Sequence, residues 1–347
     1  MPPITRIFVN GFPGLYGGAA TELHHQIITW LHMGVEVHLI PTTFLPEAEP
    51  LYLEMLNLGI QIHPCNDWNV LQPGDSIIGF CNEQFLSNLH EIRRRTKRTI
   101  FVNCMTWLFP KEKERMLKGE IAMFLYQNED VQKDHEPQLR TLNDDPKIRF
   151  KSFKPYFDAA LFPFHHKRMS EHFGCGRISR QDADKFAGNT LHIYEYFVSP
   201  KLKQGWFLGF GEQSEAKIGT PHDWIQVAKD HGELSQQKFY KHCEIILQPS
   251  DTTENWPRIG FEAMASGSVL IVDNRGGWRQ MVKHGVTGWL CEHERDFIYY
   301  ASKMAYEPNL RHDMAEAARL RGLALGGIEE SIASWELVFE EMARLPE

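Results

Sequence analysis

Short runs of apolar and β-branched residues alternate along most of this chain with longer segments of helical periodicity. The runs predicted as strands in the first half are residues 4–10, 35–40, 76–81, 99–103 and 122–126. Those in the second half are residues 173–179, 205–211, 244–248, 269–273 and 288–291. Strands separated by helices pair in parallel, because a parallel connection must cross back along the sheet. The alternation therefore predicts an α/β protein whose parallel sheets are covered by helices on both faces.

The helical segments between these runs carry apolar residues on one face. In residues 19–33, Leu23, Ile27 and Trp30 recur at helical spacing, and Gly34 ends the segment. Further helices are predicted at residues 261–265, 296–306 and 328–345.

The chain is too long for a single domain core. It has 347 residues, whereas one hydrophobic core stops growing at roughly 250–300 residues. The stretch 144–166 contains three prolines and mixes aromatic with basic residues, which is typical of a connection between domains. We therefore predict two Rossmann-like, doubly wound domains that face a cleft, residues 1–165 and residues 166–327, followed by a terminal helix at 328–347.

The charge balance and the cysteines limit the classes of partner and compartment. Lys and Arg number 37 and Asp and Glu number 45, so the formal net charge is −8. That balance excludes the broad basic surface of a nucleic-acid coat protein. No apolar run approaches the roughly 20 residues that span a bilayer, and residues 1–11 lack the regions of a signal peptide. The six cysteines form no C-x-x-C pair, so we expect reduced thiols, no zinc site and a cytoplasmic location.

A glycine-rich turn, residues 11–18, follows the first predicted strand. It does not fit a dinucleotide fingerprint, because no G-x-G-x-x-G can be written there and the second strand runs into Pro41 rather than an acidic residue. The chain also lacks G-x-x-x-x-G-K-[ST], which disfavours a nucleoside-triphosphate motor. Two interpretations stay open for Gly17 and Gly18. They lead into a helix N-terminus that binds an anion or a sugar hydroxyl, or they form a plain strand-to-helix turn.

The segment 249–274 is the most informative in the chain. A predicted strand ends in a Pro-Ser pair, a loop presents Glu254, and Glu262 follows at the opening of a short helix that Gly267 ends. Both carboxylates are expected beyond the carboxyl ends of a parallel sheet, where open α/β sheets bind ligands. A carboxylate there accepts hydrogen bonds from both hydroxyls of a ribose or sugar diol, and the helix N-terminus supplies amides for phosphate oxygens.

This segment resembles the donor site of retaining glycosyltransferases of the glycogen-synthase and sucrose-synthase type, glycosyltransferase family four, which have the GT-B fold. The stretch from Arg180 to Lys185, after a predicted strand, resembles the family's basic residues that clamp the donor diphosphate, and Arg177 is the alternative arginine. Gly276-Gly277 and residues 282–288 resemble the family's glycine turn and closing strand.

The resemblance implies a role for each matching residue of the second domain. Glu262 would hold the ribose hydroxyls of the donor, and Glu254 would lie near the transferred sugar. Arg180 and Lys185 would neutralise the leaving diphosphate. The family does not need a metal for catalysis, so no metal ligands are expected.

In the first domain the resemblance is sparser. Gly17 and Gly18 resemble the loop that touches the donor sugar and phosphate, and the terminal helix would brace this domain. Many relatives place a histidine after a central strand, near the donor sugar. Here that position falls in residues 101–107, and Asn103 or Thr106 is the candidate to replace the histidine.

Two further groups of charged or titratable residues have ordinary structural explanations beside the functional ones. The basic run 93–98 is either a solvated helix end before a strand or a surface for anionic lipid or a nucleic-acid acceptor. The pairs His24-His25 and His165-His166 lack the spacing of a helical ligand set, so we predict structural or surface roles for them.

The sequence thus predicts a retaining, metal-independent hexosyl- or pentosyltransferase without a bound cofactor. Its co-substrate would be a nucleoside-diphosphate sugar, with UDP as the expected nucleotide, and its acceptor a hydroxyl compound of open class. Two alternatives remain: a non-catalytic nucleotide-sugar binding or scaffold protein, and a glycosyltransferase that acts on a modified nucleobase of DNA. In the second alternative nucleic acid enters only as the acceptor. Epimerisation or phosphorolysis would need a base or a pyridoxal lysine that the motifs do not offer.

Overall fold

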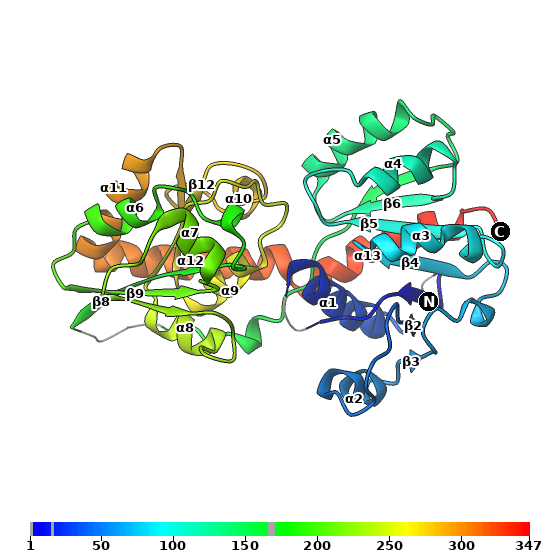
Figure 1. Cartoon of the computed structure of the whole chain (residues 1–347), viewed down its shortest axis with the longest axis horizontal. Coiled ribbons are helices and arrows are strands. Elements are labelled where there is room, and N and C mark those ends of the chain that lie inside the picture. Colours follow the sequence, from blue (N-terminus) through cyan, green and yellow to red (C-terminus); the bar gives the residue numbers. More distant parts are fainter. Residues whose placement is uncertain (1–2, 15–16, 166–170) are drawn as a thin grey trace. The chain divides into compact units, whose positions relative to one another are not determined.

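The chain forms two compact units, each built on its own parallel sheet (Figure 1). The computed structural model describes residues 3–14, 17–165 and 171–347. The first unit comprises residues 1–157 together with 326–347, and the second comprises residues 158–325. The boundaries expected from the sequence were residues 165 and 327.

Seven parallel strands form the sheet of the first unit, in the order β3-β2-β1-β4-β5-β6-β7. They are β1 (Arg6–Asn10), β2 (Glu36–Ile40), β3 (Gln61–Ile62), β4 (Ser76–Phe80), β5 (Arg98–Asn103), β6 (Met123–Tyr126) and β7 (Arg149–Ser152). The chain adds strands outward from β1 to β3 on one side and from β4 to β7 on the other, so the direction switches between β1 and β4. The loops that follow β1 and β4 diverge at this switch point, which is where open α/β sheets bind ligands.

Several helices of the first unit begin at a polar cap or a proline. The helices of this unit are α1 (Gly18–His32), α2 (Pro50–Asn57), α3 (Glu83–Ile92), α4 (Pro110–Leu117), α5 (Glu129–Arg140), α13 (Ile328–Ala343) and the short 3-10 helix η1 (Trp68–Val70). The side chains of Asn82 and Asn128 accept hydrogen bonds from first-turn amides of α3 and α5, which satisfies donors that have no partner inside the helix.

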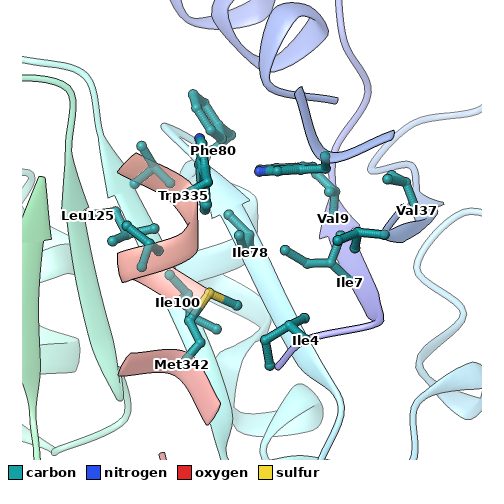
Figure 2. Close-up of a cluster of buried hydrophobic side chains, with 14 of the residues drawn as sticks. Ile4, Ile7, Val9, Val37, Ile78, Phe80, Ile100, Leu125, Trp335 and Met342 are labelled. Carbon is teal, nitrogen blue, oxygen red and sulfur yellow. The ribbon is translucent and has the colours of Figure 1, made fainter. Parts of the chain in front are cut away.

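Helix α13 completes the main hydrophobic core of the first unit (Figure 2). Trp335 is fully buried in that core, with its ring centroid 4.9 Å from that of Trp30 and 5.2 Å from that of Phe153. Its indole Nε1 also donates a hydrogen bond to the side chain of Gln26 in α1. The last helix of the chain is therefore packed against the first, although some 300 residues separate Gln26 from Trp335.

Residues of the basic run 93–98 are engaged in contacts within the first unit. The guanidinium of Arg98 donates to the carbonyl of Leu345 at 3.2 Å and so holds the chain just after α13. Arg95 donates to the side chain of Asn69 at 2.7 Å. These contacts show a structural use for the run: Arg98 of β5 holds the chain after α13, and Arg95 contacts η1.

Six parallel strands form the sheet of the second unit, in the order β10-β9-β8-β11-β12-β13. They are β8 (His172–Ile178), β9 (Leu202–Leu208), β10 (Ile225–Ala228), β11 (Ile245–Gln248), β12 (Val269–Asp273) and β13 (Gly288–Cys291). Here the direction of strand addition switches between β8 and β11, which pair directly. The loops that follow these two strands are the ones expected to hold a ligand.

The helices of the second unit are mostly short. They are α6 (Thr190–Tyr196), α7 (Glu212–Ile218), α8 (Gln236–His242), α9 (Arg258–Ser266), α10 (Trp278–Met281), α11 (Glu294–Tyr306) and α12 (Pro308–Gly326), with 3-10 turns η2 (Ala159–Leu161) and η3 (Ala183–Lys185). Helix α9 ends at Gly267, which adopts the left-handed conformation with φ of 77°. None of the helices that the structure describes is long and apolar enough to cross a bilayer.

The architecture confirms the predicted pair of doubly wound parallel sheets, and the differences are local. Strand β9 spans residues 202–208 instead of 205–211, because Gly209 turns the chain with φ of 86°. Strands β3, β7 and β10 were not predicted. They are two to four residues long and are the last strands at their sheet edges, so they lack the continuous apolar run of a strand buried on both faces.

Trp335→Ala should destabilise the first unit by about 3–5 kcal/mol, the usual cost of truncating a fully buried tryptophan. Hydrogen exchange of the β1 and β4 amides measures this free energy locally. Leu337→Ala, two residues away and 60% exposed, is the matched control, and its effect should stay within about 0.5 kcal/mol. Equal effects of the two changes would contradict the packing of α13 on this core.

Candidate functional site

The candidate site lies at the switch point of the second unit, where the loops after β8 and β11 diverge. The loop after β8 carries Arg180 and ends in the 3-10 turn η3, whose last residue is Lys185. The loop after β11 carries Glu254 and leads into α9. The topology therefore brings together the two segments that the sequence singled out.

An ion pair joins the two loops. Lys185 Nζ lies 2.8 Å from Glu254 Oε1, and the two side chains are only 17% and 25% exposed. A second pair runs alongside it, because Lys217 Nζ lies 2.6 Å from the Asp251 carboxylate. Lys217 also donates to the backbone carbonyl of Ala183, at 3.0 Å. Lys185 and Lys217 thus each link the loop after β8 to the loop after β11, and these contacts restrain the distance between the two loops.

The two candidate arginines occupy different environments. Arg180 lies at the surface with a side chain 66% exposed, 3.2 Å from the Asp182 carboxylate. Arg177, at the end of β8, is fully buried, with its guanidinium 3.8 Å from the ring centre of Phe186. Burial lowers the pKa of Arg177 to about 10. Of the two, only Arg180 is exposed to a ligand approaching from solvent.

Arg177 holds the backbone beneath the site. It donates hydrogen bonds to the carbonyl of Pro249, at 3.0 Å, and to the carbonyl of Lys185. These carbonyls belong to the loops after β11 and β8. One buried guanidinium therefore fixes the two loops to each other on their buried side. The partly exposed side chains of Lys185 and Glu254 join the same loops through their ion pair.

Glu262 lies in the middle of α9, the fifth residue of a helix that begins at Arg258, and not at the helix opening as the sequence suggested. It is 9% exposed. Its Oε2 accepts hydrogen bonds from the Tyr240 hydroxyl at 2.9 Å and from Gln236 Nε2 at 3.1 Å. Within the described residues no hydrogen bond reaches its other oxygen, Oε1, so one oxygen is held by α8 while the other keeps its capacity to accept.

The surroundings of Glu262 also change its proton affinity. Burial raises the pKa of this carboxyl to about 6, and the Tyr240 hydroxyl, the charge of Arg258 and the Gln236 amide oppose the rise. Glu262 is thus ionised at neutral pH but titrates within the range of mildly acidic solutions.

The glycine pair 276–277 lets a turn pack directly on the loop that carries Glu254. The amide of Gly277 donates to the carbonyl of Glu254 at 2.8 Å. A Cβ at Gly276 would lie 2.3 Å from that carbonyl oxygen, and a Cβ at Gly277 would lie 2.0 Å from the carbonyl oxygen of Asn255. Neither position has room for a side chain, so the glycines are required for this close approach.

Several residues of the site escaped the sequence analysis. Asp273, at the end of β12, accepts a hydrogen bond from the amide of Ser250 at 2.9 Å, and burial raises its pKa to about 6. Its signal in the sequence is an acidic residue that ends a buried strand next to β11. The partners of Glu262 on α8, Tyr240 and Gln236, carry no comparable signal, because only the packing of α8 on α9 brings them to the carboxylate.

The candidates of the first unit lie at its own carboxyl edge. Gly17 caps α1 with φ of 89°, and Gly18 is the first residue of that helix. Among the residues that the structure describes, and leaving out the chain neighbours, no atom lies within 4 Å of a Cβ built on either glycine. Leu15 and Tyr16 of the same turn lie outside the described residues. The donor contact expected of Gly17 and Gly18 stays a prediction.

Asn103, the candidate to replace a histidine, is fully buried and engaged in its own loop. Its amide nitrogen donates to the carboxylate of Glu112 at 2.9 Å and to the carbonyl of Trp107 at 3.1 Å, and its oxygen accepts from the amide of Met105 at 2.8 Å. Thr106 is half-buried within this loop. Of the two, Thr106 keeps more contact with solvent.

The histidine pairs have structural partners where the structure describes them. His24 lies 3.0 Å from Glu54, and His25 Nδ1 lies 2.8 Å from the carbonyl oxygen of Thr21. The amide of His165 donates to the carbonyl of Ser266, and His166 lies outside the described residues. Over the described ranges, no group of three or more His, Cys, Asp and Glu side chains has the arrangement of a metal site.

Gly277→Ala should destabilise the second unit by about 1–3 kcal/mol, because the new methyl group meets backbone that cannot move aside. The φ of Gly277 is −60°, so the cost arises from the collision and not from the backbone conformation. Gly188→Ala is the control, since no atom of the described residues other than its chain neighbours lies within 4 Å of its Cβ position. Denaturant unfolding compares the two variants, and equal stability would contradict the tight contact of the glycine turn with the Glu254 loop.

Known proteins match this chain in two ways: by sequence over part of the chain, and by structure over nearly all of it. Residues 227–321 match the family of glycosyl transferases group 1. Over 111 residues the chain is 31% identical to lipopolysaccharide 1,2-N-acetylglucosaminetransferase of Salmonella typhimurium. That alignment covers 30% of this chain and 27% of the relative, so the likeness spans about a quarter of the relative's length.

Solved structures match nearly the whole chain at low identity. HepE of Anabaena, crystallised with UDP and glucose, has a TM-score of 0.72 at 12% identity, with 97% of this chain and 99% of HepE covered. TarM has a TM-score of 0.75 at 10% identity over 98% of this chain and all of TarM. A glycosyltransferase of Rickettsia africae has a TM-score of 0.72 at 13% identity, with 97% of this chain and 98% of that chain covered. The two parallel-sheet units are thus those of GT-B glycosyltransferase structures, and residues 227–321 carry the group 1 match.

Proposed function

We propose that this protein is a glycosyltransferase that moves a sugar from a nucleoside diphosphate to an acceptor hydroxyl with retention of configuration. The observation that carries the proposal is the Lys185–Glu254 ion pair at the switch point, with Glu262 on the helix that follows. The group 1 match over residues 227–321 includes both glutamates and supports the assignment.

Lys185 and Arg180 are the residues proposed to receive the diphosphate. Lys185 is restrained by Glu254 and is 17% exposed, so its charge is screened less by water than that of a surface lysine. Arg180 is exposed and would exchange its Asp182 partner for phosphate oxygens. A diphosphate gains negative charge as the bond to the sugar breaks, so fixed positive charge beside it stabilises the transition state more than the ground state.

Glu262 is the residue proposed to hold the ribose. The Tyr240 hydroxyl and Gln236 amide fix its Oε2, which leaves Oε1 to accept hydrogen bonds from ribose hydroxyls. Such a buried acceptor discriminates strongly against ligands that lack the hydroxyl, because its unmet hydrogen bond costs free energy. Glu254, on the loop before α9, would lie toward the transferred sugar.

The proposed chemistry needs little covalent participation from the protein. In a retaining transfer of this kind, an oxygen of the leaving diphosphate accepts the proton of the attacking hydroxyl on the same face of the sugar. The chain then contributes positioning and charge stabilisation. Product analysis by NMR tests retention, since the donor and the glycoside must share one anomeric configuration.

UDP is the proposed nucleotide. HepE was crystallised with UDP-glucose and with UDP, which supports a uridine donor for this chain as well. The acceptor is proposed to be a hydroxyl compound. The alternative of a non-catalytic nucleotide-sugar binding protein predicts the same UDP affinity without any transfer.

Lys185→Ala should weaken the binding of UDP but leave the binding of uridine nearly unchanged. Loss of one charge-assisted hydrogen bond corresponds to a roughly tenfold to hundredfold rise in Kd. Isothermal titration calorimetry measures both ligands, and sugar transfer from the UDP-sugar should fall at least in proportion. Glu262→Ala should weaken both ligands, because uridine retains the ribose.

Lys283→Ala is the matched control, an exposed lysine of the same unit, and should bind UDP normally. Equal UDP affinity in Lys185→Ala and Lys283→Ala would refute the phosphate role. Normal UDP affinity in the parent protein with no transfer to any acceptor would instead favour the binding-protein alternative.

Uridine affinity should fall as the pH falls through about 6, the pKa to which burial raises Glu262. Protonation removes acceptor capacity from the carboxylate, so uridine should bind roughly tenfold more weakly at pH 5 than at pH 7. Uridine is chosen because it has no phosphate that titrates in this range. Without ligand the sign is opposite: the contribution of Glu262 to stability is full below its ordinary value of 4.5 and is lost as pH rises through about 6.

Two variants test whether the titration of Glu262 causes this pH dependence of uridine binding. Glu262→Gln should bind uridine weakly at every pH between 5 and 8. Asp273→Asn should keep the wild-type pH profile, although burial raises the pKa of Asp273 to about 6 as well. A profile that is lost in Asp273→Asn and kept in Glu262→Gln would show that Glu262 does not hold the ribose.

A further inference from the structure

Two histidines lie side by side at one edge of the first sheet, one on β2 and one directly after β3. Strands β1, β2 and β3 pair in parallel, with Phe8 opposite His38 and His38 opposite Gln61. His63 follows Gln61 by two residues, so its side chain lies on the same face of the sheet as that of His38. The register of the strands therefore brings the two imidazole rings together.

The two rings are joined by a hydrogen bond. His38 Nδ1 lies 2.9 Å from His63 Nε2, and the ring planes are within 5° of each other. The ring of Phe8 lies beside both imidazoles, with centroid distances of 4.5 Å to His38 and 6.0 Å to His63. His38 is buried and His63 is half-buried. The bond thus lies against an apolar side chain, where little water can solvate an added charge.

This hydrogen bond limits the number of protons that the pair can bind. A nitrogen that donates must face one with a free lone pair, so one of the two facing nitrogens carries no proton. One added proton keeps such an arrangement possible, because an imidazolium still donates to a neutral ring. Two imidazolium rings cannot share the bond, since two N–H groups and two positive charges would then face each other at 2.9 Å.

The charged groups that act on the pair come from all three elements. Among the described residues they are Arg6 on β1, Glu36 on β2 and Asp67 after β3. The Glu36 carboxylate lies 3.0 Å from His38 Nε2, whereas Arg6 is itself paired with Asp75 at 2.6 Å. Burial lowers the pKa of both histidines, although the carboxylates oppose this effect. The surroundings therefore resist protonation of the pair.

The pair fastens a strand that has few other attachments. Strand β3 is two residues long and is the last strand at its edge of the sheet. Beyond it, the amide of His63 donates to the carbonyl of Leu39 at 2.9 Å, and the amide of Asn66 donates to the carbonyl of Pro41 at 3.0 Å. A short edge strand opens locally at a lower cost in free energy than the centre of the sheet. Loss of the contact between the rings would therefore free β3 first.

We propose that His38 and His63 form an acid-sensitive latch on β3. While one ring is neutral, the latch holds β3 against β2. When both rings are protonated, it releases β3 together with residues 63–66. This device goes beyond the proposed sugar transfer and does not depend on it.

The direction of the pH dependence follows from proton binding. The released rings have the ordinary histidine pKa of 6.5, whereas the pKa of each ring in the closed latch is lower. The released state therefore binds more protons than the closed state once the pH is below 6.5. The contribution of the latch to stability is full above that pH and is lost as the pH falls below it.

Hydrogen exchange of the full chain, followed by mass spectrometry at about pH 8 and about pH 5.5, tests the latch. Protection factors are compared, because they remove the intrinsic pH dependence of amide exchange. Each proton that the closed pair excludes favours the released state roughly tenfold at one pH unit below the histidine pKa. Protection of residues 61–66 should therefore fall roughly tenfold, while that of β4, at the centre of the same sheet, should change much less. Unchanged protection of residues 61–66, or an equal loss in β4, would overturn the proposal.

His63→Gln tests the role of the second charge. The glutamine amide donates to a neutral His38 and can turn its oxygen toward a protonated one, so the pH effect on β3 should shrink to less than about threefold. His90→Gln is the matched control, an exposed histidine of the same unit, and should keep the full effect. The same tenfold fall in His63→Gln, or its loss in His90→Gln, would contradict the latch.

NMR of the histidine rings in the wild-type protein gives a second readout, which needs no variant to fold. At about pH 5.5, one ring of the pair should still be neutral in the closed state. Two charged rings beside a β3 that stays protected would overturn the proposal.

Discussion

The ion pair between Lys185 and Glu254 joins the two loops that diverge at the switch point of the second unit. A charge this far removed from water needs a partner, because leaving it unpaired costs several kcal/mol. Before a ligand binds, each member of the pair holds the other in place. A diphosphate that enters would pair with the positive charge of Lys185, in place of Glu254 or together with it. Until then, Glu254 keeps that charge paired and largely covered.

The rest of the second unit serves this geometry. Arg177 ties the backbones of the two loops together from the buried side, through the carbonyls of Lys185 and Pro249. The turn at Gly277 supports the Glu254 loop through a contact that admits no Cβ. Helix α8 sets Glu262 through Tyr240. The Glu254 loop and the Glu262 carboxylate are thus fixed by groups that do not themselves need to touch a ligand.

The switch points of the two units differ in chemistry. In the second unit it is lined by lysines and carboxylates, as suits a phosphorylated ligand. In the first unit it presents the Gly17 turn, the cap of α3 at Asn82 and the left-handed turn at Cys81. Asn103 is engaged by three hydrogen bonds, two within its own loop and one with Glu112 of α4, and its role in place of a histidine stays a prediction.

The sequence was sufficient for the architecture, and it named Lys185 and Glu254 as candidates without predicting that they pair with each other. Buried parallel strands read as apolar runs, so β12 and β13 were predicted with their observed bounds. Glu254, Glu262 and Lys185 could be selected as candidates from the local sequence around them. The burial of Arg177 and the contact of Tyr240 with Glu262 could not be predicted in this way, because they depend on tertiary packing. Edge strands such as β7 were missed because they are short and half exposed.

The most direct test of the donor site is a crystal structure of the protein with UDP bound. The account predicts the diphosphate against Lys185 Nζ, displacing or sharing the Glu254 contact, and the ribose hydroxyls within hydrogen-bond distance of Glu262 Oε1. UDP bound elsewhere, or a ribose that leaves Glu262 untouched while Tyr240 still holds it, would contradict the account.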